Sequence, residues 1–296
     1  MRALRAPARD GLGADPPELP GYRLIELLNR GNALDTHDTW SEERGCRCVV
    51  KTPRPDRVDE DGLRAAVLAE GLMLTALCHP HIVRGYEARE EPQPFAVTET
   101  LVGETLAHMI EVSNGPLEPA DAARLGLQLG SAVRYLHGRD RLHLDLKPSN
   151  VIAHGGQAKL IDLSIARPPG RVDPGCGTWC YTAPEQARGG EVTSAADVWG
   201  LGAVLFEALA GRAPFDDGDD GPEYPQLVRA AKPLGVGGPI AALVASCLDP
   251  DPGARPELPE LLAALEDLAG VPIEERRWPA PGARGRRAPR TAMRGF

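Results

Sequence analysis

The sequence predicts an α+β fold in two parts, a small β-rich N-terminal part with one helix and a larger, mainly helical C-terminal part. Between Tyr22 and Lys51, short strand-like runs alternate with turn residues. Residues 59–77 then carry leucine and valine at helical spacing, which predicts the single helix of the first part. Two long apolar segments, 119–138 and 194–210, have the pattern of helices and follow the strands.

The remaining elements follow in chain order. Strand-like runs at 83–86 and 95–99 complete the sheet of the first part. In the second part, a strand pair at 151–153 and 158–161 is the only sheet expected, and a short turn with two glycines joins its strands. Two more helical runs complete this part, at 239–248 and 257–268.

Length and composition fit one soluble unit. With 296 residues, of which 42% are hydrophobic, the chain can bury a sizeable core. Its longest apolar stretch, 198–211, is interrupted by Glu207 and is shorter than the ~20 residues that cross a bilayer. The N-terminus lacks the apolar segment of a secretory signal. We therefore expect a cytoplasmic protein with no membrane span.

The six cysteines predict neither a zinc site nor a disulfide framework, because no Cys-x-x-Cys pair is present. Most of them are expected to be reduced, packed thiols. Cys176 and Cys180 lie four residues apart and leave a second interpretation open, a redox-sensitive pair.

Charge is distributed unevenly along the chain. The formal net charge is −9, yet residues 271–296 contain seven arginines and two glutamates, a net charge of +5. This Pro-, Gly- and Arg-rich segment has no helical periodicity, so we predict a basic, disordered tail. It is expected either to fold back on the acidic body or to bind an acidic partner, a membrane surface or nucleic acid. Residues 1–19, rich in Ala, Pro and Arg, predict a disordered leader.

One short segment, His143 to Asn150, carries the groups that phosphoryl transfer needs. Asp145 can orient an attacking hydroxyl, Lys147 can neutralise a transferring phosphoryl group, and Asn150 can hold a metal ion that bridges nucleotide phosphates. The spacing resembles the H-R-D-x-K-x-x-N catalytic loop of eukaryotic-like (Hanks-type) serine/threonine protein kinases. The heavy use of Ala, Gly, Pro and Arg suits a GC-rich genome, so we expect a bacterial member of this family.

Other segments extend the resemblance along the chain. Lys51 matches the family's strand lysine that holds the nucleotide phosphates, and Glu70 matches the helix glutamate that braces this lysine. Asp162 ends a short apolar run where the family has a metal-binding aspartate. Glu185, in Ala-Pro-Glu, and Arg255 match an ion pair of the family. Asp197 resembles the aspartate that braces the catalytic-loop backbone.

The resemblance implies a two-lobed protein-kinase fold over residues 20–270, with an N-lobe (20–98), a hinge (99–103) and a C-lobe (104–270). It implies ATP with Mg²⁺ or Mn²⁺ and a protein substrate. The implied catalytic residues are Asp145 and Lys147, and the implied metal ligands are Asn150 and Asp162. The implied nucleotide-binding residues are Gly31, Val49, Lys51, Glu70, Glu99, Leu101 and Ile152.

Two departures from the family bear on activity and its control. The phosphate-covering loop, 28–36, retains only Gly31 of three glycines, which lets fewer backbone amides approach phosphate closely. Leu144 replaces the arginine that precedes the catalytic aspartate. Without that arginine, a phosphate on the activation segment, the stretch between Asp162 and Glu185, loses its main charged partner.

Three functions are compatible with these residues. The intact catalytic set favours an active, ATP-dependent serine/threonine kinase that phosphorylates protein hydroxyls, and Lys147 and Thr178 match the serine/threonine branch. The degenerate loop instead favours a pseudokinase that acts as a nucleotide-sensing scaffold or switch. A small-molecule phosphotransferase generally lacks the Ala-Pro-Glu segment found here. The oligomeric state does not follow from these patterns.

Overall fold

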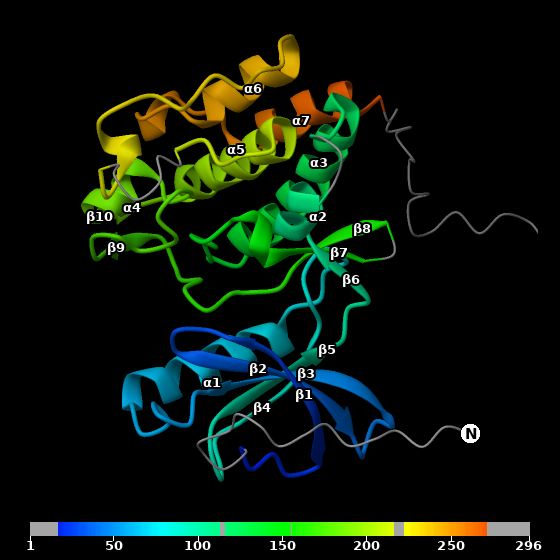
Figure 1. The fold of residues 1–296 in the computed structure, drawn as a ribbon. Helices are drawn as coiled ribbons and strands as arrows, with labels where there is room; N and C mark the ends of the chain where they lie inside the picture. Colours follow the sequence, from blue (N-terminus) through cyan, green and yellow to red (C-terminus); the bar gives the residue numbers. More distant parts are fainter. Residues whose placement is uncertain (1–16, 113–115, 155, 216–221, 271–296) are drawn as a thin grey trace, which may run out of the picture.

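The computed structural model describes residues 17–112, 116–154, 156–215 and 222–270. They form two lobes, a small one built on a sheet and a larger helical one (Figure 1). The predicted tail at 271–296 and most of the predicted leader lie outside the described residues. Leu19, which we assigned to the leader, is buried in the core of the N-lobe, so packing begins one residue before the predicted start of the domain.

The N-lobe is built on an antiparallel sheet with the strand order β1-β2-β3-β5-β4. The strands are β1 (Tyr22–Arg30), β2 (Leu34–Ser41), β3 (Cys46–Pro53), β4 (Gly85–Arg89) and β5 (Phe95–Glu99). Strand β3 lies at the centre, paired with both β2 and β5. Lys51 is therefore carried by a strand that is supported on both sides.

Helix α1 (Asp61–Ala76) packs against this sheet at very short range. A Cβ atom added to Gly85 of β4 would lie 2.5 Å from the carbonyl carbon of Leu74, so only glycine fits there without a shift of the helix. A Cβ on Gly71 would lie 2.7 Å from the Cβ of Ala88. The same face of α1 buries Glu70, which brings a carboxylate under the sheet.

The C-lobe is organised around helix α5 (Ser194–Ala210), most of whose residues are buried. Thr193 caps this helix by accepting a hydrogen bond from the amide of Ala195 at 3.3 Å. The other helices are α2 (Leu106–Val112), α3 (Pro119–His137), α4 (Pro184–Arg188), α6 (Pro239–Cys247) and α7 (Leu258–Ala269), with 3₁₀ turns at Pro148–Asn150, Pro225–Leu227 and Pro252–Ala254. Helix α3 packs on α5 and α7. No helix in the described part of the chain is long and apolar enough to cross a bilayer.

Short strands complete the C-lobe. Strands β6 (Gly103–Thr105), β7 (Val151–His154) and β8 (Gln157–Leu160) form one antiparallel sheet in that order. Strands β9 (Gly170–Val172) and β10 (Gly190–Val192) form another. The predicted pair β7–β8 is confirmed, but the expectation that it is the only sheet of the second part is wrong. The added strands have three residues each, too few to show an alternating pattern.

The predicted strand at 83–86 is only partly correct. Ile82 forms a bridge with Leu160 of β8, and the amide of Val83 donates to the carbonyl oxygen of Leu160 at 2.8 Å. Val83, the first residue of the predicted run, therefore joins the C-lobe, and β4 begins at Gly85. The predicted long helices are confirmed as α3 and α5, whereas the seven-residue helix α2 was not predicted.

Candidate active site

The predicted catalytic loop, residues 143–150, is fastened to helix α5 through one buried carboxylate. Asp197 accepts hydrogen bonds from the backbone amides of His143 and Leu144, each at 2.8 Å, and its Oδ2 lies 2.7 Å from His137 Nε2. Leu144 has a φ of +64°, a left-handed value that is unfavourable for a residue with a branched side chain. The two bonds to Asp197 hold the loop in this conformation.

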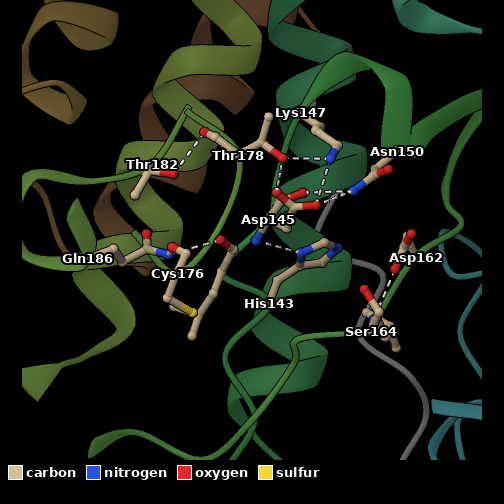
Figure 2. A network of polar contacts seen from close by, with 12 residues as sticks. His143, Asp145, Lys147, Asn150, Asp162, Ser164, Cys176, Thr178, Thr182 and Gln186 are labelled. Atoms are coloured by element: carbon tan, nitrogen blue, oxygen red, sulfur yellow. Dashed lines mark hydrogen bonds and ion pairs between the residues drawn. The ribbon is translucent and has the colours of Figure 1, made fainter. Parts of the chain in front are cut away.

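Three predicted residues lie together next to Leu144 (Figure 2). Asp145 Oδ2 lies 2.8 Å from Lys147 Nζ and 2.9 Å from Asn150 Nδ2. Asn150 Nδ2 also donates to the carbonyl oxygen of Asp145 at 3.0 Å. Because the side chains of Asp145 and Lys147 are mostly buried, their charges interact more strongly than they would in water.

Thr178 joins this group from the activation segment, the stretch between Asp162 and Glu185. Its hydroxyl donates to Asp145 Oδ1 at 2.6 Å and accepts from Lys147 Nζ at 2.6 Å (Figure 2). A hydroxyl is thus held between a carboxylate that can accept its proton and an ammonium that can neutralise negative charge. The same two groups can accept the proton of a substrate hydroxyl and neutralise the negative charge that develops.

Sequence reasoning missed Gln186, which links the activation segment to the catalytic loop. Its Nε2 donates to the carbonyl oxygens of Leu144 at 2.9 Å and Cys176 at 2.8 Å, and its Oε1 accepts from the amide of Ala183 at 3.2 Å. The side chain is almost fully buried. Gln186 directly follows the Ala-Pro-Glu segment, but no sequence pattern indicates a partner 42 residues away.

A second charged cluster lies between the lobes. Lys51 Nζ is 2.8 Å from Glu70 Oε1 and 3.3 Å from Asp162 Oδ2. The Oε1 of Glu70 also accepts from the amide of Leu163 at 3.2 Å. The predicted pair of Lys51 and Glu70 is therefore formed, and it touches the segment that carries Asp162.

Burial and neighbouring charges act against each other in this cluster. Burial raises the pKa of Glu70, and the hydrogen bonds from Lys51 and Leu163 oppose this rise. Burial alone lowers the pKa of Lys51, but the carboxylates of Glu70 and Asp162 outweigh burial and raise it. Burial also opposes ionisation of Asp162, yet Lys51 and the amide of Ser164 hold its pKa at about 2. Lys51 and Asp162 are thus both ionised at neutral pH.

Asn150 and Asp162 fit a divalent cation that is held together with nucleotide phosphates. Asn150 donates through Nδ2 to Asp145, which leaves its Oδ1 as the acceptor. Asp162 is ionised, and its Oδ1 accepts from the amide of Ser164 at 2.9 Å. Mg²⁺ is typically bound by one or two protein oxygens plus phosphate. Within the described ranges, no cluster of three or more His, Cys, Asp or Glu residues could hold a metal alone.

The predicted hinge residues connect the two lobes. Glu99 ends β5, and its Oε1 accepts from Lys159 Nζ of β8 at 2.5 Å and from the amide of Arg84 at 2.9 Å. Leu101 follows and packs against the C-lobe core. Ile152 lies on β7, directly opposite Lys159 in the register of that sheet. The carboxylate of Glu99 is therefore already bound by Lys159 and by the backbone amide of Arg84.

The other two predicted residues lie in the N-lobe. Val49 is on β3, opposite Thr98 of β5, and two residues before Lys51. Gly31 lies in the turn between β1 and β2, where its amide donates to the carbonyl oxygen of Leu34 at 2.8 Å. Among the residues described, only Asp140 and Leu144 have positive φ apart from glycines. The residues that replace the family's glycines thus adopt ordinary backbone angles.

The Ala-Pro-Glu segment is anchored by the predicted ion pair. Arg255 donates to both carboxylate oxygens of Glu185, at 2.7 and 2.8 Å, and its side chain is fully buried. It also donates to the carbonyl oxygens of Ala195 at 2.8 Å and Asp249 at 2.8 Å. This bidentate pair fixes the end of the activation segment on the C-lobe.

The order of these groups along the chain agrees with one family model. The model of the protein kinase domain matches residues 22–264. The chain belongs to the protein kinase family. The match covers most of both lobes, and every site residue predicted above falls within it.

Several named kinases are similar to this protein kinase. The serine/threonine-protein kinase PrkC of Bacillus subtilis is 36% identical to it over 202 residues, which cover 66% of the chain and 31% of PrkC. The serine/threonine-protein kinase PkaA of Streptomyces coelicolor is 33% identical over 270 residues, which cover 84% of the chain and 50% of PkaA. A CBL-interacting protein kinase of rice is 32% identical over 270 residues, 86% of the chain and 57% of the relative. The chain thus spans about half the length, or less, of these relatives.

Proposed function

We propose that this protein kinase transfers the γ-phosphoryl group of ATP to serine or threonine hydroxyls of a protein substrate. The observation that carries the proposal is the position of the Thr178 hydroxyl, which is bound by Asp145 and Lys147 at 2.6 Å each. These two residues can orient and neutralise a reacting hydroxyl in the same way. The serine/threonine names of the bacterial relatives support the choice of acceptor.

In the proposed reaction, the substrate hydroxyl donates a hydrogen bond to Asp145, which receives its proton as the new O–P bond forms. The bond between the γ-phosphorus and the β–γ bridging oxygen breaks, and ADP leaves with that oxygen. Lys147 neutralises charge on the transferring group, while Lys51, braced by Glu70, holds the α- and β-phosphates.

Asn150 and Asp162 are proposed to hold Mg²⁺ or Mn²⁺. When bound, such an ion neutralises the phosphate oxygens of the nucleotide. The backbone of Glu99 and Leu101, with Val49 and Ile152 on either side, is proposed to bind the adenine ring, and Gly31 to lie over the phosphates.

The deciding experiment incubates the purified chain with γ-labelled ATP and Mg²⁺, with a generic basic protein or with a peptide that offers only tyrosine. We expect label on serine or threonine of the protein and none on the tyrosine peptide. Asp145→Asn serves as the inactive control. Because the loop at 28–36 retains only Gly31, a pseudokinase is the second candidate. Nucleotide binding without label on any protein, including the kinase itself, would favour it.

We extend the proposal to the segments that flank the kinase domain. We propose a domain that begins at Leu19, one residue before the predicted start at 20, and ends at 270. A leader precedes it, and a basic tail (271–296) that binds an acidic partner follows it. A cytoplasmic location stays a prediction. A bacterial origin also stays a prediction, because relatives from rice and from bacteria match to a similar degree.

A further inference from the structure

The tip of the loop between β1 and β2 is held by its backbone carbonyl groups. The carbonyl oxygen of Asn32 accepts from Arg57 Nη1 at 3.1 Å, and that of Gly31 lies 3.4 Å from Arg54 Nη1. The carbonyl oxygen of Ala33 accepts from the backbone amide of Arg54 at 3.0 Å. All three donors belong to the segment that leads from β3 into helix α1. The tip is therefore tied to a different part of the N-lobe.

Both arginines divide their donors in the same way. Arg54 directs Nε and Nη2 to the two carboxylate oxygens of Asp56, each at 2.9 Å, and keeps Nη1 for the loop. Arg57 directs Nε and Nη2 to Glu60, at 2.6 and 2.7 Å, and again keeps Nη1 for the loop. Only a planar guanidinium can form a bidentate pair and a third bond at once.

Asp56 and Glu60, the carboxylates that pair with the two arginines, are ionised at neutral pH. The hydrogen bonds from Arg54 lower the pKa of Asp56, and those from Arg57 lower the pKa of Glu60. Each guanidinium is therefore oriented by an ionised carboxylate on its own segment. Arg57 and Glu60 are also joined through the backbone, because the amide of Glu60 donates to the carbonyl oxygen of Arg57 at 3.1 Å.

Holding the carbonyl groups also fixes the amides that follow them. In a trans peptide the N–H points away from the C=O. The amides of Asn32, Ala33 and Leu34 are therefore directed away from the arginines. Across the base of the turn, Arg30 binds both carboxylate oxygens of Asp35, at 3.0 and 2.9 Å.

We propose that Arg54 and Arg57 are positioning residues for nucleotide binding, which hold the glycine-poor loop over the phosphates through its backbone carbonyls. The inference rests on the proposed use of ATP. Neither arginine needs to touch the nucleotide in this arrangement. Their effect on affinity passes through the loop, which they couple to the helix that carries Glu70.

The first test does not need nucleotide. Hydrogen exchange of the free chain reports on the amides of Gly31 and Arg54, since both donate within this network. Arg57→Ala should speed exchange at these two amides about three- to tenfold, the effect of losing one net hydrogen bond. Arg23→Ala, which removes an exposed arginine from β1, is the matched control and should change neither rate. Unchanged exchange in an Arg54→Ala/Arg57→Ala double variant would overturn the proposal.

The second test uses steady-state kinetics. Arg57→Ala should raise KM for MgATP about three- to tenfold with less than a twofold change in kcat, because only the preformed loop is lost. Arg57→Lys should behave like the alanine variant, since one ammonium cannot keep Glu60 in a bidentate pair and also reach Asn32. A lysine variant with normal KM but fast loop exchange would mean direct contact of charge with the nucleotide, and would refute the loop mechanism. If the wild-type chain binds no nucleotide, the proposed function fails, while hydrogen exchange still decides whether the arginines order the loop.

Discussion

Gln186 binds the carbonyl oxygen of Leu144 through a neutral hydrogen bond of 2.9 Å, so the activation segment is attached to the catalytic loop without any phosphate. The same amide nitrogen holds Cys176 in the middle of the segment. Gly177 makes room for this contact, because a Cβ there would lie 2.9 Å from the carbonyl oxygen of Leu144. The ordered segment is thus a property of the unmodified chain.

We therefore predict that activity does not depend on phosphorylation of the activation segment. Thr178 is bound to Asp145 and Thr182 is buried, so a phosphate on either would place negative charge beside the carboxylate of Asp145 or in the core. Ser164 adjoins Asp162. Initial rates should be the same before and after complete dephosphorylation, checked by mass spectrometry. A tenfold loss that is recovered on rephosphorylation would contradict this prediction.

Gln186→Glu should lower both stability and activity. The carboxylate keeps the shape of the side chain but cannot donate to Leu144 and Cys176, so two buried carbonyl groups lose their partner. We expect a loss of about 1–3 kcal/mol in the free energy of unfolding for each carbonyl group left unsatisfied. Denaturant titration measures this loss. Gln226→Glu, at a second buried glutamine that donates to the carbonyl oxygens of Trp179 and Thr182, serves as the comparison.

Asp145 and Asp162 should lose different functions. Asp145→Asn should keep MgATP binding and lose roughly 10²–10⁴-fold in phosphoryl transfer, because the carboxylate acts on the hydroxyl. Asp162→Ala should abolish metal-dependent nucleotide binding. Titration calorimetry with ATP, with and without Mg²⁺, separates the two. Equal MgATP affinity in both variants would show that the division of roles is wrong.

Removing Arg255 should destabilise the C-lobe strongly. Its buried guanidinium holds Glu185 and two backbone carbonyls, so Arg255→Leu leaves a largely buried carboxylate without its partner. The expected cost is about 3–5 kcal/mol in the free energy of unfolding. Adding Glu185→Gln should recover part of this loss. If the double variant is less stable than the sum of the single effects, the assumed coupling is incorrect.

The cysteines should differ sharply in reactivity toward a thiol reagent at pH 8. Cys78 is exposed, whereas burial raises the pKa of Cys48 to about 11 and that of Cys247 to about 12. Because the thiolate is the reactive form, both buried residues should stay unlabelled until the chain unfolds, and Cys78 should react first. Peptide mass spectrometry of timed samples measures the order. Burial also raises the pKa of Cys176, which disfavours the redox pair with Cys180.

The sequence predicted the long elements better than the short ones. Helices α3 and α5 have enough turns to show a helical period, and β3 has an apolar run before Lys51. Strands β9 and β10 have three residues each and exist because they pair with one another. A run whose residues pair with strands of both lobes, as the one that starts at Val83 does, has no sequence pattern of its own.

The same distinction applies to the site. Lys51, Glu70, Asp145 and Asp162 could be found because their chemistry and spacing match a known family. Gln186 could not, since its partners are backbone carbonyls that any residue could supply. Arg54 and Arg57 likewise act on carbonyl groups, so their role depends on the three-dimensional path of the loop.

The contact between Gly85 and Leu74 bears on how this kinase can be inhibited. At Gly85, helix α1 rests on the backbone of β4, because residue 85 has no side chain that could rotate away and open a space. A compound that works by pushing this helix outward would have to separate two packed backbones, together with the Lys51–Glu70 pair that the helix supports. Compounds of that design should therefore bind this chain weakly, and those that leave the helix in place should bind better.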